Sequence, residues 1–252
     1  DNLIVYEDSK SRYKEVYYER FSNLIVERLS YCGFKKCTGD IMPSNPNWRG
    51  SYSQWANRIN TLCRFTASDF KKNLVTLISL TDLRVIYGDL SLGERFIKGV
   101  YNSIFDNAIV VNEISKSAAS LGVAKGFMRT LKVEKKGPYK GMINIKLHGW
   151  APLVLAIRAF AIKNKITEVG TIKRIDALVK AGAFTSEDGR LLKKDYLLLS
   201  RIKVMAQVFY LNGKYPSEHY VHPDDLTKSE KEQLLDALSD IEKIQKLLIE
   251  SM

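Results

Sequence analysis

Residues 73–89, "NLVTLISLTDLRVIYGD", decide how the first half of the chain is interpreted. The stretch is rich in leucine and β-branched residues and ends in a Gly-Asp turn, which is typical of a buried strand. Alternate side chains of a strand share a face, so Asp82 and Arg84 would project together at its far end. A charged pair after so much apolar sequence is costly to bury without a partner. The pair is therefore either a structural ion pair or turn, or part of a functional site.

A second strand is predicted at residues 1–9, "DNLIVYEDS", where apolar residues begin without a Met or a flexible lead-in. The pattern is that of a strand cut through its middle, and we expect sequence upstream of it. Asp1 would then lie at the start of a strand beside the one that carries Asp82. Two carboxylates at one sheet edge could hold Mg²⁺, and Arg84 could meet a phosphate there.

Helical periodicity dominates the remainder. Residues 11–34 show an amphipathic pattern that stops at Gly33, and residues 53–65 predict a short helix. The intervening residues 37–51 are rich in Pro, Gly, Asn and Ser and predict a long loop. Further helices are predicted at residues 91–105, 109–120, 150–163, 171–181, 191–211 and 227–250, with a Gly/Pro-rich extended segment at residues 137–152. Thr227 and Glu230 have the spacing of a capping box.

The order of these elements predicts an α+β fold. A small mixed sheet with helices, truncated at its N-terminus, would occupy residues 1–108. An all-α helical bundle would occupy residues 109–252.

Composition narrows the class of partner. The formal net charge of +11 favours an anionic partner, but the Lys and Arg residues are spread along the chain without a nucleic-acid-binding signature. No apolar run approaches the ~20 residues that a membrane span needs. The three cysteines form no CxxC motif and fit reduced thiols. We therefore expect a cytoplasmic protein, with neither nucleic acid nor a membrane as its partner.

The loop motif "PSNPNWR" (residues 43–49) supplies further candidates for nucleotide or acceptor binding. Trp48 could stack on a base, Arg49 could grip a phosphate and Asn45 could line the same pocket. The alternative is a packed loop in which Trp48 fills a gap beside the sheet.

Two basic residues in the second half are also candidates for substrate binding. Lys146 lies within the predicted extended segment, and Arg174 lies in the first turn of the helix predicted at residues 171–181. Both have a structural alternative, a contact at a domain junction or within the helix packing. His219 and His222 have H-x-x-H spacing, but too few further ligands are close in sequence for zinc, so a surface turn is the simpler interpretation.

Several motifs resemble one bacterial family. Residues 1–9 look like the tail of a nucleotidyltransferase signature, in which a Gly-Ser turn and a helix precede a strand beginning D-x-D. The motifs "PSNPNWR", "SLTDLRVIYGD" and "IKLHGWAPLV" follow the nucleotidyltransferase family related to the PII-protein uridylyltransferase. Its members are often fused behind cyclic-nucleotide-binding and CBS domains, so the resemblance implies regulatory domains upstream. It also implies that residues 1–108 form a truncated nucleotidyltransferase-type domain and that the helical bundle of residues 109–252 binds the substrate.

The resemblance implies that Asp1 is the second aspartate of D-x-D and that Asp82 is the third metal-binding carboxylate. Mg²⁺ held by such carboxylates neutralises the charge that develops during nucleotidyl transfer. The first aspartate and the Gly-Ser turn are expected before residue 1. We therefore expect this chain alone to be inactive or nearly so.

The leading hypothesis is an Mg²⁺-dependent, uridylyltransferase-like enzyme of a signal-transduction protein. It would transfer a nucleoside monophosphate from an NTP to a protein or small-molecule acceptor. The alternative hypothesis is a regulatory module that binds a nucleotide without turning it over. A nucleic-acid-binding protein would rest on the basic charge alone.

Overall fold

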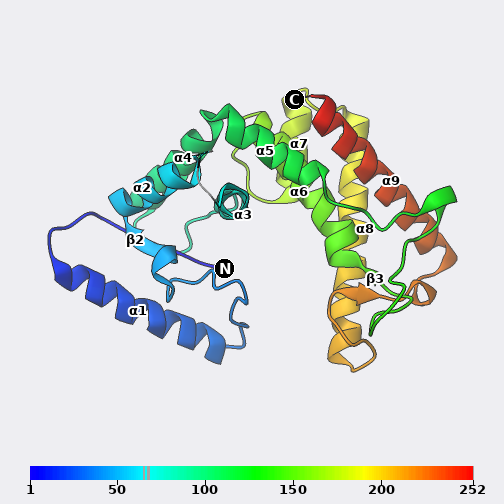
Figure 1. Ribbon diagram of the computed structural model, residues 1–252, viewed down its shortest axis with the longest axis horizontal. Helices are drawn as coiled ribbons and strands as arrows, with labels where there is room; N and C mark the ends of the chain where they lie inside the picture. The colour runs from blue at the N-terminus through cyan, green and yellow to red at the C-terminus, as the bar shows by residue number, and fades with distance from the viewer. Residues whose placement is uncertain (65, 67–68, 252) are drawn as a thin grey trace. The chain divides into compact units, whose positions relative to one another are not determined.

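The computed structural model describes residues 1–64, 66 and 69–251, and it divides into two units, Asp1–Asp106 and Asn107–Met252. Both units are mainly helical, and the described residues hold two sheets of two strands each (Figure 1). The α+β class with a helical C-terminal region is confirmed. The sequence pattern had placed the boundary near residue 108, and the division falls between Asp106 and Asn107.

The first unit is built on a parallel pair of short strands. β1 (Ile4–Tyr6) pairs with β2 (Arg49–Ser51), with Val5 opposite Gly50. α1 (Arg12–Tyr31) and the loop after it connect the two strands. Within that loop, η1 (Pro46–Trp48) is a single 3-10 turn that leads directly into β2.

The predicted stop of α1 is confirmed. Gly33 has φ +93°, a conformation that residues with a Cβ adopt only with strain. The amide of Gly33 donates to the Ser30 carbonyl and that of Phe34 to the Leu29 carbonyl, both at 3.0 Å. These two bonds form a Schellman motif, which satisfies carbonyls that the helix end leaves free.

The predicted apolar face of α1 is buried only in part. Tyr17 and Leu24 of that face are 59% and 48% exposed, whereas Val26, which the predicted face does not include, is buried. Tyr18 stacks on Tyr6 of β1 with ring centroids 4.2 Å apart, so this contact fixes which side of α1 faces the strands.

Three more helices complete the first unit: α2 (Tyr52–Leu62), α3 (Phe70–Leu80) and α4 (Leu90–Phe105). Ser51 and Gln54 form a capping box at the start of α2, and Asp89 caps α4. Phe65, the end of the helix predicted at residues 53–65, lies outside the described residues. Trp55 of α2 is 1% exposed and packs against Phe96 of α4.

The strand predicted at residues 73–89 is wrong. Residues 73–80 belong to α3, whose buried side chains are Phe70, Leu74, Leu77 and Leu80. Their spacing of four, three and three residues is the period of a helix. Val75 is 62% exposed, as expected on the opposite face of the helix. Phe70 lies before the quoted stretch and extends its helical pattern by one turn.

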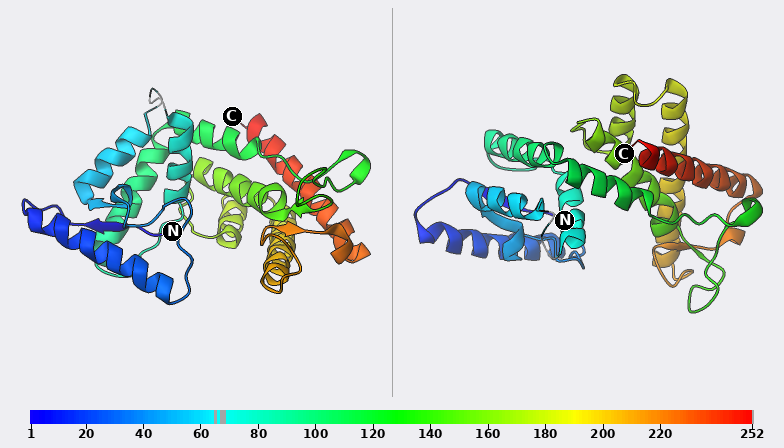
Figure 2. Two further views of the ribbon diagram at one scale, coloured as in Figure 1. Left: turned by 60° about the horizontal axis from the view of Figure 1, so that its bottom comes forward. Right: turned by 45° about the horizontal axis from the view of Figure 1, so that its top comes forward.

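The second unit contains five longer helices that pack against one another (Figures 1 and 2). They are α5 (Ala108–Ala119), α6 (Ala151–Lys163), α7 (Thr171–Lys180), α8 (Ser186–Leu211) and α9 (Lys228–Glu250). Each matches a predicted helix, although α8 begins five residues earlier because Thr185 caps it. Thr227 and Glu230 form the predicted capping box, with the Thr227 amide donating to Glu230 Oε2 at 2.7 Å.

The segment predicted as extended at residues 137–152 is mostly not strand. β3 (Ile143–Asn144) has two residues and pairs antiparallel with β4 (Tyr220–Val221). η3 (Lys146–Trp150) is a π-helix that leads into α6. The surface turn predicted around His219 is corrected as well, because β4 lies within it. A 3-10 turn, η2 (Phe127–Arg129), precedes β3, and η4 (Pro223–Asp225) follows β4.

Among the described residues, no helix is long and apolar enough to cross a membrane.

Candidate functional site

The two candidate metal-binding aspartates do not lie on neighbouring strands. Asp1 is exposed and precedes β1, where the amide of Asn2 donates to the Ile41 carbonyl at 3.1 Å. Asp82 follows the C-cap of α3, and its amide donates to the Ser79 carbonyl. The strand expected to bring Asp82 beside β1 is a helix, so the sheet does not join the two carboxylates. Arg84 is exposed in the same loop.

The donor chemistry of this region suits Mg²⁺, because carboxylate oxygens are its preferred protein ligands. In the described part of the chain, however, no three His, Cys, Asp or Glu side chains come together as ligands for a metal ion. The described residues therefore do not by themselves make a complete metal centre.

Asn45 and Arg49 hold the "PSNPNWR" loop together. Arg49 Nη1 donates to the carbonyls of Pro43 and Ser44 at 3.0 and 2.7 Å. Asn45 accepts from the Asn47 amide at 2.9 Å and donates to Asp40 Oδ2 at 2.8 Å. These bonds use the polar groups that the sequence offered for ligand binding, and they favour the packed-loop alternative.

Trp48 lies beside a second tryptophan, Trp55. Its ring is half-buried, and its centroid is 6.2 Å from that of Trp55. The Trp55 indole donates to the Ile4 carbonyl at 3.0 Å. Trp48 thus extends the aromatic packing around β1.

The second unit brings Lys146 close to His219. The amide of Ile145 donates to the His219 carbonyl at 3.0 Å, which continues the β3–β4 pairing by one residue. Lys146 Nζ then lies 3.4 Å from His219 Nε2, and both side chains are half-buried. An ammonium group has only donors, so this contact requires that Nε2 act as the acceptor.

A second lysine joins them from α8. Lys203 Nζ lies 4.5 Å from the centre of the Trp150 ring, and Trp150 Nε1 donates to Ser200 Oγ at 3.1 Å. Burial lowers the pKa of Lys203, the positive charge of Lys146 lowers it further, and Glu218 acts in the opposite direction. Lys203 thus lies against η3, the element that Lys146 begins. We call Lys146, Lys203 and His219 the cationic cluster.

The π-helix positions this cluster. Gly149 is buried in η3, and a Cβ at this position would lie 3.0 Å from Leu199 Cδ2 of α8. The absence of that Cβ lets η3 approach α8 closely, which places Trp150 against Lys203. π-Helical turns are frequently found at functional sites. The sequence offered Lys146 alone, because nothing in the local pattern marks Lys203 or relates His219 to it.

Arg174, the other candidate in this unit, lies on α7 and is 2% exposed. A ligand would have to enter the helix packing to reach it. Its role in substrate binding stays a prediction, and its burial favours the structural alternative.

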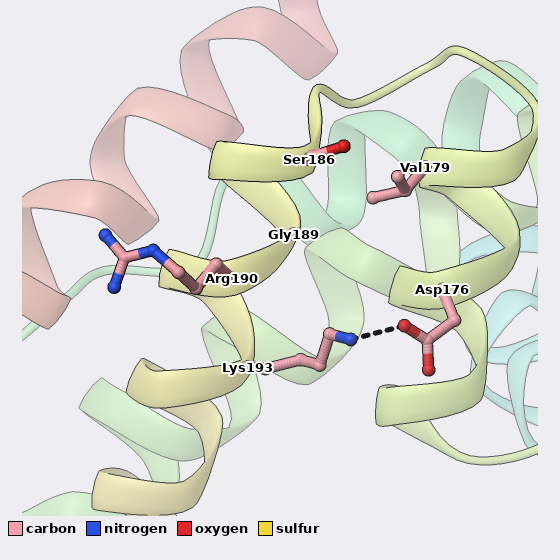
Figure 3. A pocket seen from close by; sticks show the side chains of 6 residues that line it. All are labelled: Asp176, Val179, Ser186, Gly189, Arg190 and Lys193. Carbon is pink, nitrogen blue, oxygen red and sulfur yellow. Dashed lines mark hydrogen bonds and ion pairs between the residues drawn. The ribbon is translucent and has the colours of Figure 1, made fainter.

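A shallow pocket of about 400 Å³ lies between α7 and α8 (Figure 3). Lys193 forms an ion pair with Asp176 across it. Arg190 points away from the other labelled side chains and pairs with Glu187, with Nε–Oε2 at 2.9 Å. Both cations of this pocket are neutralised, which makes it a poorer anion site than the cationic cluster.

Two family models match the chain. Residues 108–251, more than half of the chain, match the model described as "Putative nucleotidyltransferase substrate binding domain". Residues 1–69 match the model described as "Putative nucleotidyltransferase DUF294". The chain belongs to this nucleotidyltransferase family. No curated protein and no solved structure matches it.

The two matches divide the candidate residues of this nucleotidyltransferase. Asp1 and the loop residues Asn45, Trp48 and Arg49 lie in the first matched range, whereas Asp82 and Arg84 lie in neither. Arg174 and the whole cationic cluster lie in the range matched to a substrate-binding domain. The geometry and the family match thus point to the same half of the chain for substrate binding.

Proposed function

We propose that this member of the nucleotidyltransferase family transfers a nucleoside monophosphate from an NTP to a protein or small-molecule acceptor. The match of residues 1–69 and of residues 108–251 to nucleotidyltransferase models carries the proposal. In the proposal the enzyme is uridylyltransferase-like, bacterial and cytoplasmic, and it belongs to a signal-transduction protein with regulatory domains upstream. The second unit presents the substrate.

Mg²⁺ dependence is part of the proposal. Asp1 and Asp82 are the proposed carboxylate ligands, and Arg84 is proposed to contact phosphate. Their residue types support these roles, since a divalent ion and an arginine both neutralise phosphate charge. Very low turnover by the 252-residue chain alone also belongs to the proposal.

Transfer of a labelled nucleotide tests it. The chain, and a version extended at its N-terminus with the preceding residues of its gene, are incubated with Mg²⁺, α-labelled NTPs and cell extract. We expect label on an acceptor with the extended protein and little with the 252-residue chain. Asp82→Asn in the extended protein should abolish transfer, and Asp106→Asn, an exposed C-cap residue of α4, should not. Absence of transfer with every NTP would refute the enzymatic proposal.

A second function, nucleotide sensing without turnover, is favoured by the incomplete set of metal ligands in the described residues. It predicts that the extended protein binds an NTP at equilibrium and returns it unchanged. Chromatography of the nucleotide after prolonged incubation separates the two functions.

A further inference from the structure

The cationic cluster lacks acceptors for its donors. Within the described part of the chain, Lys146 Nζ has the His219 ring as its one polar contact, and Lys203 Nζ lies over the Trp150 ring. Neither ammonium group has a carboxylate within ion-pair distance among those residues. Glu218 is close enough to act on Lys203 electrostatically, so the cluster is not without a counter-charge.

The imidazole adds a second unsatisfied group. His219 Nδ1 is buried and has no hydrogen-bond partner in the described residues. If Nε2 accepts from Lys146, the neutral ring carries its proton on Nδ1, where nothing receives it. A buried donor without an acceptor costs about 1–3 kcal/mol. An anionic acceptor placed between Lys146 and His219 would let Nε2 carry the proton and donate it to the anion.

The three groups come from separate elements that fix their positions. Lys146 begins the π-helix, His219 is bonded through its carbonyl to Ile145, and Lys203 lies on α8. The side chains are half-buried and therefore reachable from solvent. A preorganised set of donors around a missing acceptor is the arrangement that binds an oxyanion strongly, because little side-chain ordering remains to be done on binding.

We infer that Lys146, Lys203 and His219 form a binding site for a phosphate group of the substrate. The inference deepens the proposed function. It depends on that function only in calling the bound phosphate a part of the substrate. Two ammonium groups and one imidazole N–H match the several oxygens of a phosphate or diphosphate, and each bond to it is charge-assisted. The phosphate can come from the nucleotide or from a phosphorylated acceptor, since both present the same oxyanion.

Titration calorimetry on the 252-residue chain tests the site, with pyrophosphate, inorganic phosphate, a sugar phosphate and Mg²⁺–NTP as probes. Lys146→Met and Lys203→Met should each weaken pyrophosphate binding about tenfold or more, the usual effect of losing a charge-assisted bond. His219→Asn should also weaken it. Lys180→Met is the control. Lys180 is exposed at the end of α7, and the substitution removes the same charge from the same unit. It should leave the affinity within about twofold.

The binding results identify the source of the phosphate and decide whether the inference holds. Tighter binding of an NTP than of pyrophosphate would assign the phosphate to the nucleotide, and tighter binding of a sugar phosphate would assign it to the acceptor. No binding of any probe at millimolar concentration would overturn the inference, as would an equal loss in Lys180→Met. Should Lys203→Met lose helical circular dichroism, Lys146→Met and His219→Asn still decide. The binding measurement requires no nucleotide transfer. A negative result in the transferase assay therefore does not decide whether the phosphate site exists.

Discussion

Trp55 of α2 donates a hydrogen bond from its indole nitrogen to the carbonyl oxygen of Ile4, at 3.0 Å. Trp55 is 1% exposed, and its ring also packs against Phe96 of α4. One side chain thus ties β1 to two helices of the first unit. A two-stranded sheet is marginal by itself, so β1 and β2 depend on such contacts for their stability.

Trp55→Phe should destabilise the first unit by about 1–2 kcal/mol. Phenylalanine keeps most of the packing but leaves the Ile4 carbonyl without its indole donor. Urea unfolding followed by circular dichroism measures the change. Trp48→Phe is the matched control, because Trp48 is half-buried and no indole bond is seen in the described residues. An equal effect of the two substitutions would show that the Ile4 bond is unimportant.

Arg49→Met should loosen the "PSNPNWR" loop. The substitution removes the donors to the Pro43 and Ser44 carbonyls while keeping much of the aliphatic length. We expect faster amide hydrogen exchange in residues 43–49. We also expect the free energy of unfolding to fall by about 1–3 kcal/mol, the usual effect of losing hydrogen bonds to a charged group. Arg28→Met, in the exposed last turn of α1, is the control. Weaker nucleotide binding with unchanged exchange would instead place Arg49 in the site.

Local signals carried most of the helix prediction. Gly33 with its positive φ and the Thr227–Glu230 capping box act within a few residues, so the sequence alone shows them. The strand predicted at residues 73–89 was wrong because Leu74 and Leu80 fit the period of a strand as well as that of a helix. Their burial together with Phe70 and Leu77 selects the helix, and burial depends on the tertiary fold.

The candidate site was harder to predict for the same reason. Lys146 was found from its motif, but Lys203 and His219 join it only through η3, α8 and the β3–β4 pairing. The loop residue Arg49 is a candidate from sequence because an arginine can grip a phosphate. Its side chain instead satisfies two backbone carbonyls, which no local pattern reveals.

Gly189→Ala should destabilise the packing of α7 against α8. A Cβ at Gly189 would lie 2.5 Å from Val179 Cγ2, too close for two carbon atoms. We expect the free energy of unfolding to fall by roughly 1–3 kcal/mol, the usual cost of overpacking. Thermal unfolding measures it, and Val179→Ala in the same chain should restore part of the loss because it removes the clashing methyl group. Losses that simply add in the double variant would contradict this contact.

Asp195 should make the stability of the second unit depend on pH. Its side chain is 4% exposed on α8, and Oδ2 has no hydrogen-bond partner in the described residues. Burial raises its pKa to about 7, and the charges of Asp240 and Asp236 on α9 act in the same direction. Lys194 and Lys243 oppose the shift but do not cancel it.

The sign of this dependence follows from proton linkage. The unfolded carboxyl has a pKa of about 3.9, so between about pH 4 and 7 the folded chain retains a proton that the unfolded chain releases. The contribution of this group is therefore fully present below about pH 4 and is lost as pH rises towards 7. The free energy of unfolding falls by on the order of 4 kcal/mol at most.

Asp195→Asn cannot ionise. It should flatten this part of the stability profile and raise stability at pH 8 relative to the unmodified chain. Glu232→Gln, an exposed residue of α9, is the control and should leave the slope nearly unchanged. Equal slopes for the unmodified chain and Asp195→Asn, measured by chemical denaturation from pH 4 to 8, would show that Asp195 is ionised in the folded protein.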